Sequence, residues 1–171
     1  MNLNGVVIRQ VMREDLPGLE WEGEYTHFRR MYADAFQRAE SGEEILWVAE
    51  VAPSRLIGQL FVHLDNQRND ISGREPHAYL YGFRIRPVYR GRGIGSLMLR
   101  VAEQDLLQRG YRRVVLNVSR TNLEARRLYE RMGYRVFGTD PGRWSYVDDQ
   151  GKTREVHEPA WRMEKILRNH D

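Results

Sequence analysis

Cysteine is absent from this chain of 171 residues, and the five histidines are scattered without an HxH or HExxH spacing. Without thiols the chain can form no disulfide bond, thiolate nucleophile or cysteine-ligated metal site, and the histidine spacing predicts no metal site either. Long apolar runs are absent as well: none approaches the roughly 20 residues of a membrane span, and the N-terminal residues have no signal-peptide core. We therefore expect a cytoplasmic protein without a membrane partner.

Lysine is scarce, since Lys152 and Lys165 are the only lysines among 27 basic residues, and the formal net charge is a modest +3. Basic proteins often bind nucleic acid. Here the arginines alternate with acids along a predicted helix at 124–131, which is typical of a solvated face, so we expect no nucleic-acid partner. Hydrophobic residues make up 41% and charged residues 30%, a balance that predicts a single globular domain over residues 1–171.

The most informative stretch of the sequence is YLYGFRIRPVYRGRGIGSLML over residues 79–99, in which arginine and glycine alternate over 90–93. Its first part has the period of two of a strand, which Pro87 ends because proline has no N–H to donate. The glycines then lead directly into a helical apolar pattern. A helix N-terminus presents unpaired N–H groups, and neighbouring arginines add positive charge. The sequence therefore predicts an anion site at Arg90, Gly91, Arg92, Gly93, Ile94, Gly95 and Ser96.

The spacing of these glycines separates the turn from two common phosphate loops. It does not fit GxGxxG, and no Gly-Lys-Ser/Thr follows as in a P-loop. It does match Arg/Gln-x-x-Gly-x-Gly/Ala, as Arg90-x-x-Gly93-x-Gly95. That pattern resembles the pyrophosphate loop of the GCN5-related N-acetyltransferases (the GNAT family), which holds coenzyme A. On spacing alone, a tight connection and a phosphate site are equal alternatives.

A second motif strengthens the resemblance. The run NLEARRLYERMGY over residues 122–134 resembles the family's other hallmark, an Asn followed by a Leu-Tyr pair and then by Gly and an aromatic residue. Together the two motifs give a resemblance that is best over residues 5–138. It implies an acetyl-CoA-dependent N-acetyltransferase that transfers the acetyl group directly, in a ternary complex, to a small amine or a peptide N-terminus.

The periodicities predict an α/β fold: a central, mixed, mostly antiparallel twisted sheet of about seven strands with helices on both faces. Asp15 is expected to cap the first helix, Thr121 to Glu124 fits a capping box, and the polar segment 65–76 predicts a loop. Residues 149–151 predict a turn between two strand-like runs. The expected strands lie near 5–11, 45–51, 56–64, 79–85, 114–118, 134–137 and 160–167. The expected helices lie near 16–21, 28–40, 94–109 and 121–132.

The resemblance also implies roles for residues at the cofactor. The backbone of Phe83, Arg84 and Ile85 would pair with the pantetheine arm, while remaining an ordinary strand. Asn122 would bond the cofactor arm, although it is also a candidate N-cap. Tyr129 would be the general acid, since a phenol of pKa ~10 can return a proton to a thiolate; its spacing alone favours a core tyrosine.

The general base is not identified by the resemblance. Some relatives carry a glutamate where this chain has Asn117, which cannot take a proton, and others carry one near 79–81, where this chain has no carboxylate. The alternatives are a water relay or one of Glu158, Glu155, His157, Glu22, Glu24 and His63.

Two segments combine acids with aromatic rings, which is typical of a site that holds a cationic amine before its deprotonation. We expect the acceptor cleft between them, while the same charges are also typical of plain solvation. The acceptor residues would be Glu22, Glu24, Tyr25, Trp144, Tyr146 and Glu158. An acyl-CoA-binding sensor without catalysis is the alternative function, and assembly into a homodimer stays open.

Overall fold

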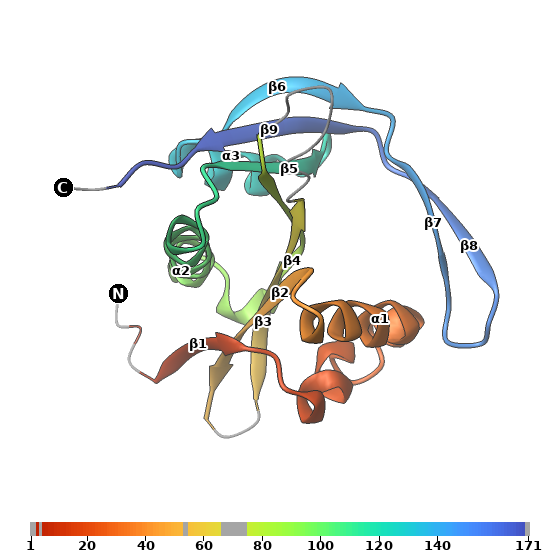
Figure 1. Ribbon diagram of the computed structural model, residues 1–171. Coiled ribbons are helices and arrows are strands. Elements are labelled where there is room, and N and C mark those ends of the chain that lie inside the picture. Colours follow the sequence, from red (N-terminus) through yellow and green to blue (C-terminus); the bar gives the residue numbers. More distant parts are fainter. Residues whose placement is uncertain (1–2, 4, 53–54, 66–74, 170–171) are drawn as a thin grey trace.

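The computed structural model describes residues 3, 5–52, 55–65 and 75–169. Seven strands form one sheet in the order β1-β2-β3-β4-β5-β9-β6 (Figure 1). Neighbouring strands are antiparallel except for the parallel pair β4 and β5, which confirms the predicted mixed, mostly antiparallel sheet. The strands are β1 (Val6–Gln10), β2 (Glu44–Val51), β3 (Leu56–Asp65), β4 (His77–Ile85), β5 (Arg113–Ser119), β6 (Arg135–Asp140) and β9 (Ala160–Ile166).

Helices cover both faces of this sheet, as predicted, with α1 and α2 on opposite sides of the central strands (Figure 1). Among the residues that the structure describes, no helix is long and apolar enough to cross a membrane. The α-helices are α1 (Arg29–Glu40), α2 (Ile94–Gln108) and α3 (Leu123–Arg131), and the 3-10 helices are η1 (Arg13–Glu20), η2 (Thr26–Phe28) and η3 (Pro87–Tyr89).

The two layers follow from the alternation of side chains along each strand. In β2, Ile45 and Trp47 join the core that contains the apolar face of α2, whereas Leu46 and Val48 join a second core beneath α1. Successive side chains of a strand point to opposite faces, so an unbroken apolar strand feeds both cores. This arrangement makes β2 and β3 the buried centre of the protein.

The strand-like runs on either side of residues 149–151 form a separate hairpin, β7 (Arg143–Val147) and β8 (Thr153–His157), as predicted. The hairpin extends beyond the ends of β6 and β9 and lies beside α1 (Figure 1). Two rings of the hairpin, Trp144 and Tyr146, pack on Phe28, which lies just before α1. Their centroids are 6.3 and 5.0 Å from the centroid of the Phe28 ring.

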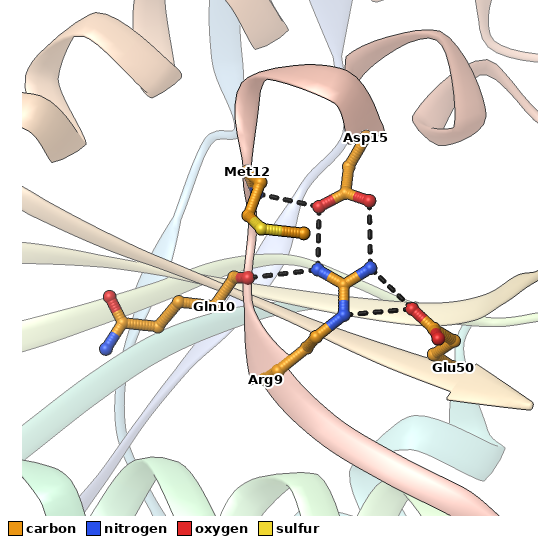
Figure 2. A network of polar contacts seen from close by, with 5 residues as sticks. All are labelled: Arg9, Gln10, Met12, Asp15 and Glu50. Atoms are coloured by element: carbon orange, nitrogen blue, oxygen red, sulfur yellow. Dashed lines mark hydrogen bonds and ion pairs between the residues drawn. The ribbon is translucent and has the colours of Figure 1, made fainter. Parts of the chain in front are cut away.

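The predicted helix over 16–21 is wrong in type and start, because η1 is a 3-10 helix that begins at Arg13. Asp15 therefore lies inside its first turn, where its carboxylate accepts the Met12 N–H at 2.7 Å (Figure 2). The same carboxylate accepts two hydrogen bonds from Arg9, which also donates to Glu50 at 2.9 Å. This network ties β1, β2 and η1 together.

The start of α3 also differs from the predicted capping box. The N-cap is Asn122 and not Thr121, since Asn122 Oδ1 accepts the N–H of Ala125 at 3.1 Å. The loop predicted over 65–76 falls mostly outside the described residues. Pro53 and Ser54, between β2 and β3, also lie outside them, and the two strands pair antiparallel.

Candidate active site

The two parallel strands at the centre of the sheet separate where the sequence places the site. The pairing of β4 with β5 runs from His77–Arg113 to Leu80–Leu116, although β4 continues to Ile85 and β5 to Ser119. Gly82 lies in an irregularity of β4, with a φ of +61° that favours glycine. A gap therefore opens in the sheet, bordered by strand edges with which an extended ligand can pair as an added strand.

A cavity of about 470 Å³, here called the α2-side cavity, lies between the end of β4, the N-terminus of α2 and α3. Most residues predicted to bind the cofactor line it. They are Phe83, Arg84, Ile85, Arg90, Gly91, Gly93, Gly95, Ser96, Asn122 and Tyr129. Arg92 and Ile94 do not: the Arg92 guanidinium lies over the Tyr89 ring at 5.4 Å, and Ile94 is a core residue with 2% exposure.

The glycine turn brings the N-terminus of α2 to this cavity. Gly91 and Gly93 have φ values of +75° and +84°, a left-handed region in which side chains are strained. Gly95 has a different role, because a Cβ there would meet Leu128 Cδ2 at 3.3 Å and Phe83 Cζ at 3.4 Å. Unpaired N–H groups of the first helical turn and the positive end of the dipole are therefore available to an anion.

Tyr129 reaches the α2-side cavity from α3. Its ring packs on Phe83 and Tyr134, with centroids 6.2 and 5.8 Å apart, and only 8% of the residue is exposed. Burial raises the pKa of the Tyr129 phenol well above its ordinary value, and the neighbouring Tyr79 adds to the shift. Since its pKa is raised, the phenol is protonated at neutral pH. No described residue forms a hydrogen bond with its Oη, so a ligand can receive this proton.

A second cavity, of about 610 Å³, lies against α1 and is here called the α1-side cavity. Trp144 and Glu158, both predicted acceptor residues, line it, and Arg84 lines both cavities. Tyr146 packs on the ring of Trp144, with centroids 5.4 Å apart, and Tyr25 lines the α2-side cavity. The hairpin and α1 thus form the walls of this second cavity.

The acidic segment before η2 does not supply the carboxylates of either cavity. Glu22 is bound by Arg86 at 2.7 Å and its side chain is 72% exposed; this hydrogen bond lowers the pKa of Glu22. Glu24 is exposed and also lines neither cavity. These two residues, predicted to belong to the acceptor cleft, therefore lie outside both cavities.

Of the other candidate bases, Glu155 and His157 line a shallow hollow of the β7–β8 hairpin, and His63 is exposed on β3 and lines neither cavity. Besides Glu158, the α1-side cavity contains two carboxylates that the sequence did not single out, Asp34 and Asp140. They come from α1 and from the end of β6, so only the fold brings them together.

The floor of the α1-side cavity is formed by polar side chains of the two separating strands. Tyr79 and Tyr81 come from β4 and Asn117 from β5. Burial raises the pKa of Tyr79, and the carboxylate of Asp140 raises it further. Asn117 Oδ1 is buried and has no hydrogen-bond partner within the described ranges, so a donor from a ligand can satisfy it. Among the described histidines, aspartates and glutamates, no cluster is arranged to hold a metal ion.

Comparisons with known proteins agree with this geometry. The profile of the Acetyltransferase (GNAT) family matches residues 8–134. The uncharacterized N-acetyltransferase YycN of Bacillus subtilis (strain 168) is 26% identical over 107 residues, which are 62% of this chain. The chain spans 65% of YycN and smaller shares of the two mycothiol acetyltransferases that it also matches.

Two solved structures share the fold over nearly the whole chain. NAA60 of Arabidopsis thaliana in complex with acetyl-CoA superimposes with a TM-score of 0.70 at 21% identity, covering 95% of this chain and 98% of NAA60. Naa20 of Chaetomium thermophilum in complex with a bisubstrate analogue gives 0.69 at 24% identity, covering 94% of this chain and 86% of Naa20. The family match covers most of the chain and includes both motifs up to Tyr134, and the chain therefore belongs to the acetyltransferase (GNAT) family.

Proposed function

We propose that the protein is an acetyl-CoA-dependent N-acetyltransferase that acetylates a primary amine directly, in a ternary complex, within a single domain of residues 1–171. The observation that supports this most is that two cavities share Arg84, on the part of β4 that lies beyond its pairing with β5. One cavity contains a helix N-terminus suited to phosphate, and the other contains carboxylates suited to an ammonium group. Arg84 lines both cavities.

The α2-side cavity fits the cofactor. The turn at Gly91 and Gly93 would hold the pyrophosphate at the N-terminus of α2, with Arg90 beside it. The stretch of β4 from Phe83 to Ile85, which has no described partner on β5, would pair with the extended arm. Asn122 Oδ1 already accepts one hydrogen bond as the cap of α3, so its amide nitrogen and the second lone pair of Oδ1 remain to bind the arm.

When bound, acetyl-CoA supplies an acetyl thioester, whose C–S bond breaks as the amine nitrogen bonds to the carbonyl carbon. Tyr129 holds a proton on Oη and delivers it to the departing sulfur. Glu158 lines the α1-side cavity and takes the proton of the amine, directly or through a water. Asn117 cannot accept that proton, and its buried Oδ1 instead orients the amine by accepting one of its N–H groups.

The alternative is an acyl-CoA-binding sensor without catalysis, which the amide at Asn117 favours because some relatives carry a carboxylate there. Release of free thiol from acetyl-CoA in the presence of a panel of amines separates the two functions. The enzyme releases thiol in proportion to acetylated amine, whereas the sensor shows a raised melting temperature with acetyl-CoA and no amine-dependent thiol. The second result would overturn the proposal of catalysis.

A further inference from the structure

We propose that the acceptor amine carries a carboxylate, and that Arg84 binds this carboxylate in the α1-side cavity. The proposal rests on the proposed acetyltransferase function and names the class of acceptor.

Arg84 is enclosed by aromatic rings. Its guanidinium carbon lies 3.4 Å from the ring centroid of Tyr25 and 5.4 Å from that of Trp21. One of its nitrogens donates a hydrogen bond to the Tyr32 hydroxyl, while Nε is buried and lacks a partner among the described residues. Rings and a hydroxyl orient a guanidinium but do not neutralise it.

No carboxylate of the described ranges forms an ion pair with Arg84, although acids are abundant nearby. Glu20 is bound by Arg29 at 2.9 Å, and Glu22 is bound by Arg86 at 2.7 Å. A partly buried cation without a counterion is unfavourable, and a planar guanidinium matches the geometry of a carboxylate. Arg84 is thus placed to receive an anion from a ligand.

The alternation of side chains along β4 indicates which ligand supplies that anion. Phe83 and Ile85 pack into the core on the α2 side, whereas Arg84 contacts Tyr25 and Tyr32 of the α1-side layer. The phosphate site at the N-terminus of α2 belongs to the opposite face of the sheet. Arg84 and Tyr25 also line the α2-side cavity, but the guanidinium bonds Tyr32, which lines the α1-side cavity alone, and this orientation assigns its anion to the acceptor and not to the pyrophosphate.

The α1-side cavity also has groups for the other charge of such an acceptor. Asp34, Asp140 and Glu158 line it and suit an ammonium group. Two further arginines line it, Arg143 and Arg38, of which Arg38 is paired with Glu44. A cavity with both signs of charge fits an amine that also carries a carboxylate. A polyamine, which has only positive charges, would leave Arg84 without a counterion and would be repelled by it.

The test compares acceptors in matched pairs. Glycine, β-alanine and 4-aminobutanoate are each assayed beside their carboxamides, and so is a dipeptide amide with Asp or Asn as the second residue. Spermidine serves as a polyamine. We expect the carboxylate of the best pair to raise kcat/KM by about 10–100-fold over its neutral analogue. Equal or better use of the neutral members and of spermidine would overturn the inference.

Two variants assign the effect to one side chain. Arg84→Gln should raise the KM of the best carboxylate acceptor by about 10–100-fold and leave the KM of its amide nearly unchanged. Arg86→Gln is the matched control, because Arg86 also lies over Trp21, at 5.0 Å, but is neutralised by Glu22. Equal losses for the acid and the amide in Arg84→Gln would show a structural role only.

The acetyl-CoA-induced rise in melting temperature, measured for each variant, reports cofactor binding independently of acceptor use. It therefore distinguishes a wrong role for Arg84 from a wrong proposed function. Acetylation of amines without a preference for carboxylates would contradict the role of Arg84 and leave the proposed function intact. Binding of acetyl-CoA without acetylation of any acceptor in the panel would contradict both.

Discussion

The rings of Phe83 on β4 and Tyr129 on α3 pack with their centroids 6.2 Å apart, and both residues line the α2-side cavity. This contact places the phenol of Tyr129 beside the strand that is proposed to pair with the cofactor arm. The proton donor and the cofactor strand are therefore held together by the apolar packing between α3 and the sheet.

The glycine turn can be tested by its backbone conformation. Gly93→Val should abolish the acetyl-CoA-induced rise in melting temperature, since Gly93 is the N-cap of α2 at a φ of +84° and valine is strained there. Gly110→Val is the matched control: Gly110, at a φ of +90°, follows the other end of the same helix. Loss of the rise in melting temperature in both variants, or in neither, would show that the turn is not part of the cofactor site.

The base of the β7–β8 hairpin should tolerate only glycine at position 142. A Cβ on Gly142 would lie 1.7 Å from the carbonyl oxygen of Glu158, so Gly142→Ala must displace the backbone. We expect a loss in the free energy of unfolding clearly above the ~1–2 kcal/mol of left-handed strain. Gly151→Ala, where the φ is +84° but the nearest atom is the flexible end of Arg30 at 3.4 Å, should cost only that strain. Equal losses in urea denaturation would contradict the close contact at Gly142.

The network of Figure 2 predicts a dependence of stability on pH. Hydrogen bonds from Arg9 hold the pKa of Asp15 below its ordinary value, so the pair stabilises the fold above pH ~4 and its contribution is lost as pH falls through the lowered pKa. Asp15→Asn should cost roughly 1–3 kcal/mol at pH 7. The difference from wild type, measured by urea denaturation, should shrink steadily below pH 4. A constant difference down to pH 2 would show that the charge is not involved.

The base should be identified by comparing Glu158 with Glu22. Glu158→Gln should lower kcat by roughly 10²–10⁴, the usual contribution of a general base, and leave the KM of acetyl-CoA unchanged. Glu22→Gln should alter neither constant, since Glu22 is paired with Arg86 outside both cavities. Asp140→Asn extends the comparison within the α1-side cavity. Full turnover in Glu158→Gln, with a loss of turnover in Asp140→Asn, would show that Asp140 and not Glu158 is the general base.

The sequence predicted what depends on local order. The period of two up to Ile85, the break at Pro87 and the helical pattern from Ile94 are local signals, so the placement of the glycine turn before α2 could be predicted. The start of the 3-10 helix η1 at Arg13 could not be predicted. The Asp15 carboxylate accepts hydrogen bonds from Arg9 and Met12, and Asp15 does not act as an N-cap. Competing hydrogen bonds decided that boundary.

The α1-side cavity could be predicted only in part, because its residues meet through long-range packing. Asp34 and Asp140 belong to α1 and β6, and no spacing in the sequence relates them. The pairing of Glu22 with Arg86 joins residues 64 positions apart and removes a carboxylate that composition had suggested for the site. Trp144 and Glu158 could be predicted because their segment combines acids with aromatic rings.

The proposed role of Tyr129 as the general acid can be tested by kcat of Tyr129→Phe in an assay limited by chemistry. The substitution keeps the ring between Phe83 and Tyr134 and deletes a hydroxyl that no described residue bonds, so the free energy of unfolding should change by less than ~1 kcal/mol. Turnover should fall by roughly 10²–10⁴ with acetyl-CoA affinity nearly unchanged. Because burial raises the phenol pKa, wild-type kcat should show its basic limb only above pH 10, and the variant should lack that limb. Wild-type turnover in Tyr129→Phe would show that the phenol is only a core side chain and would contradict the proposed mechanism.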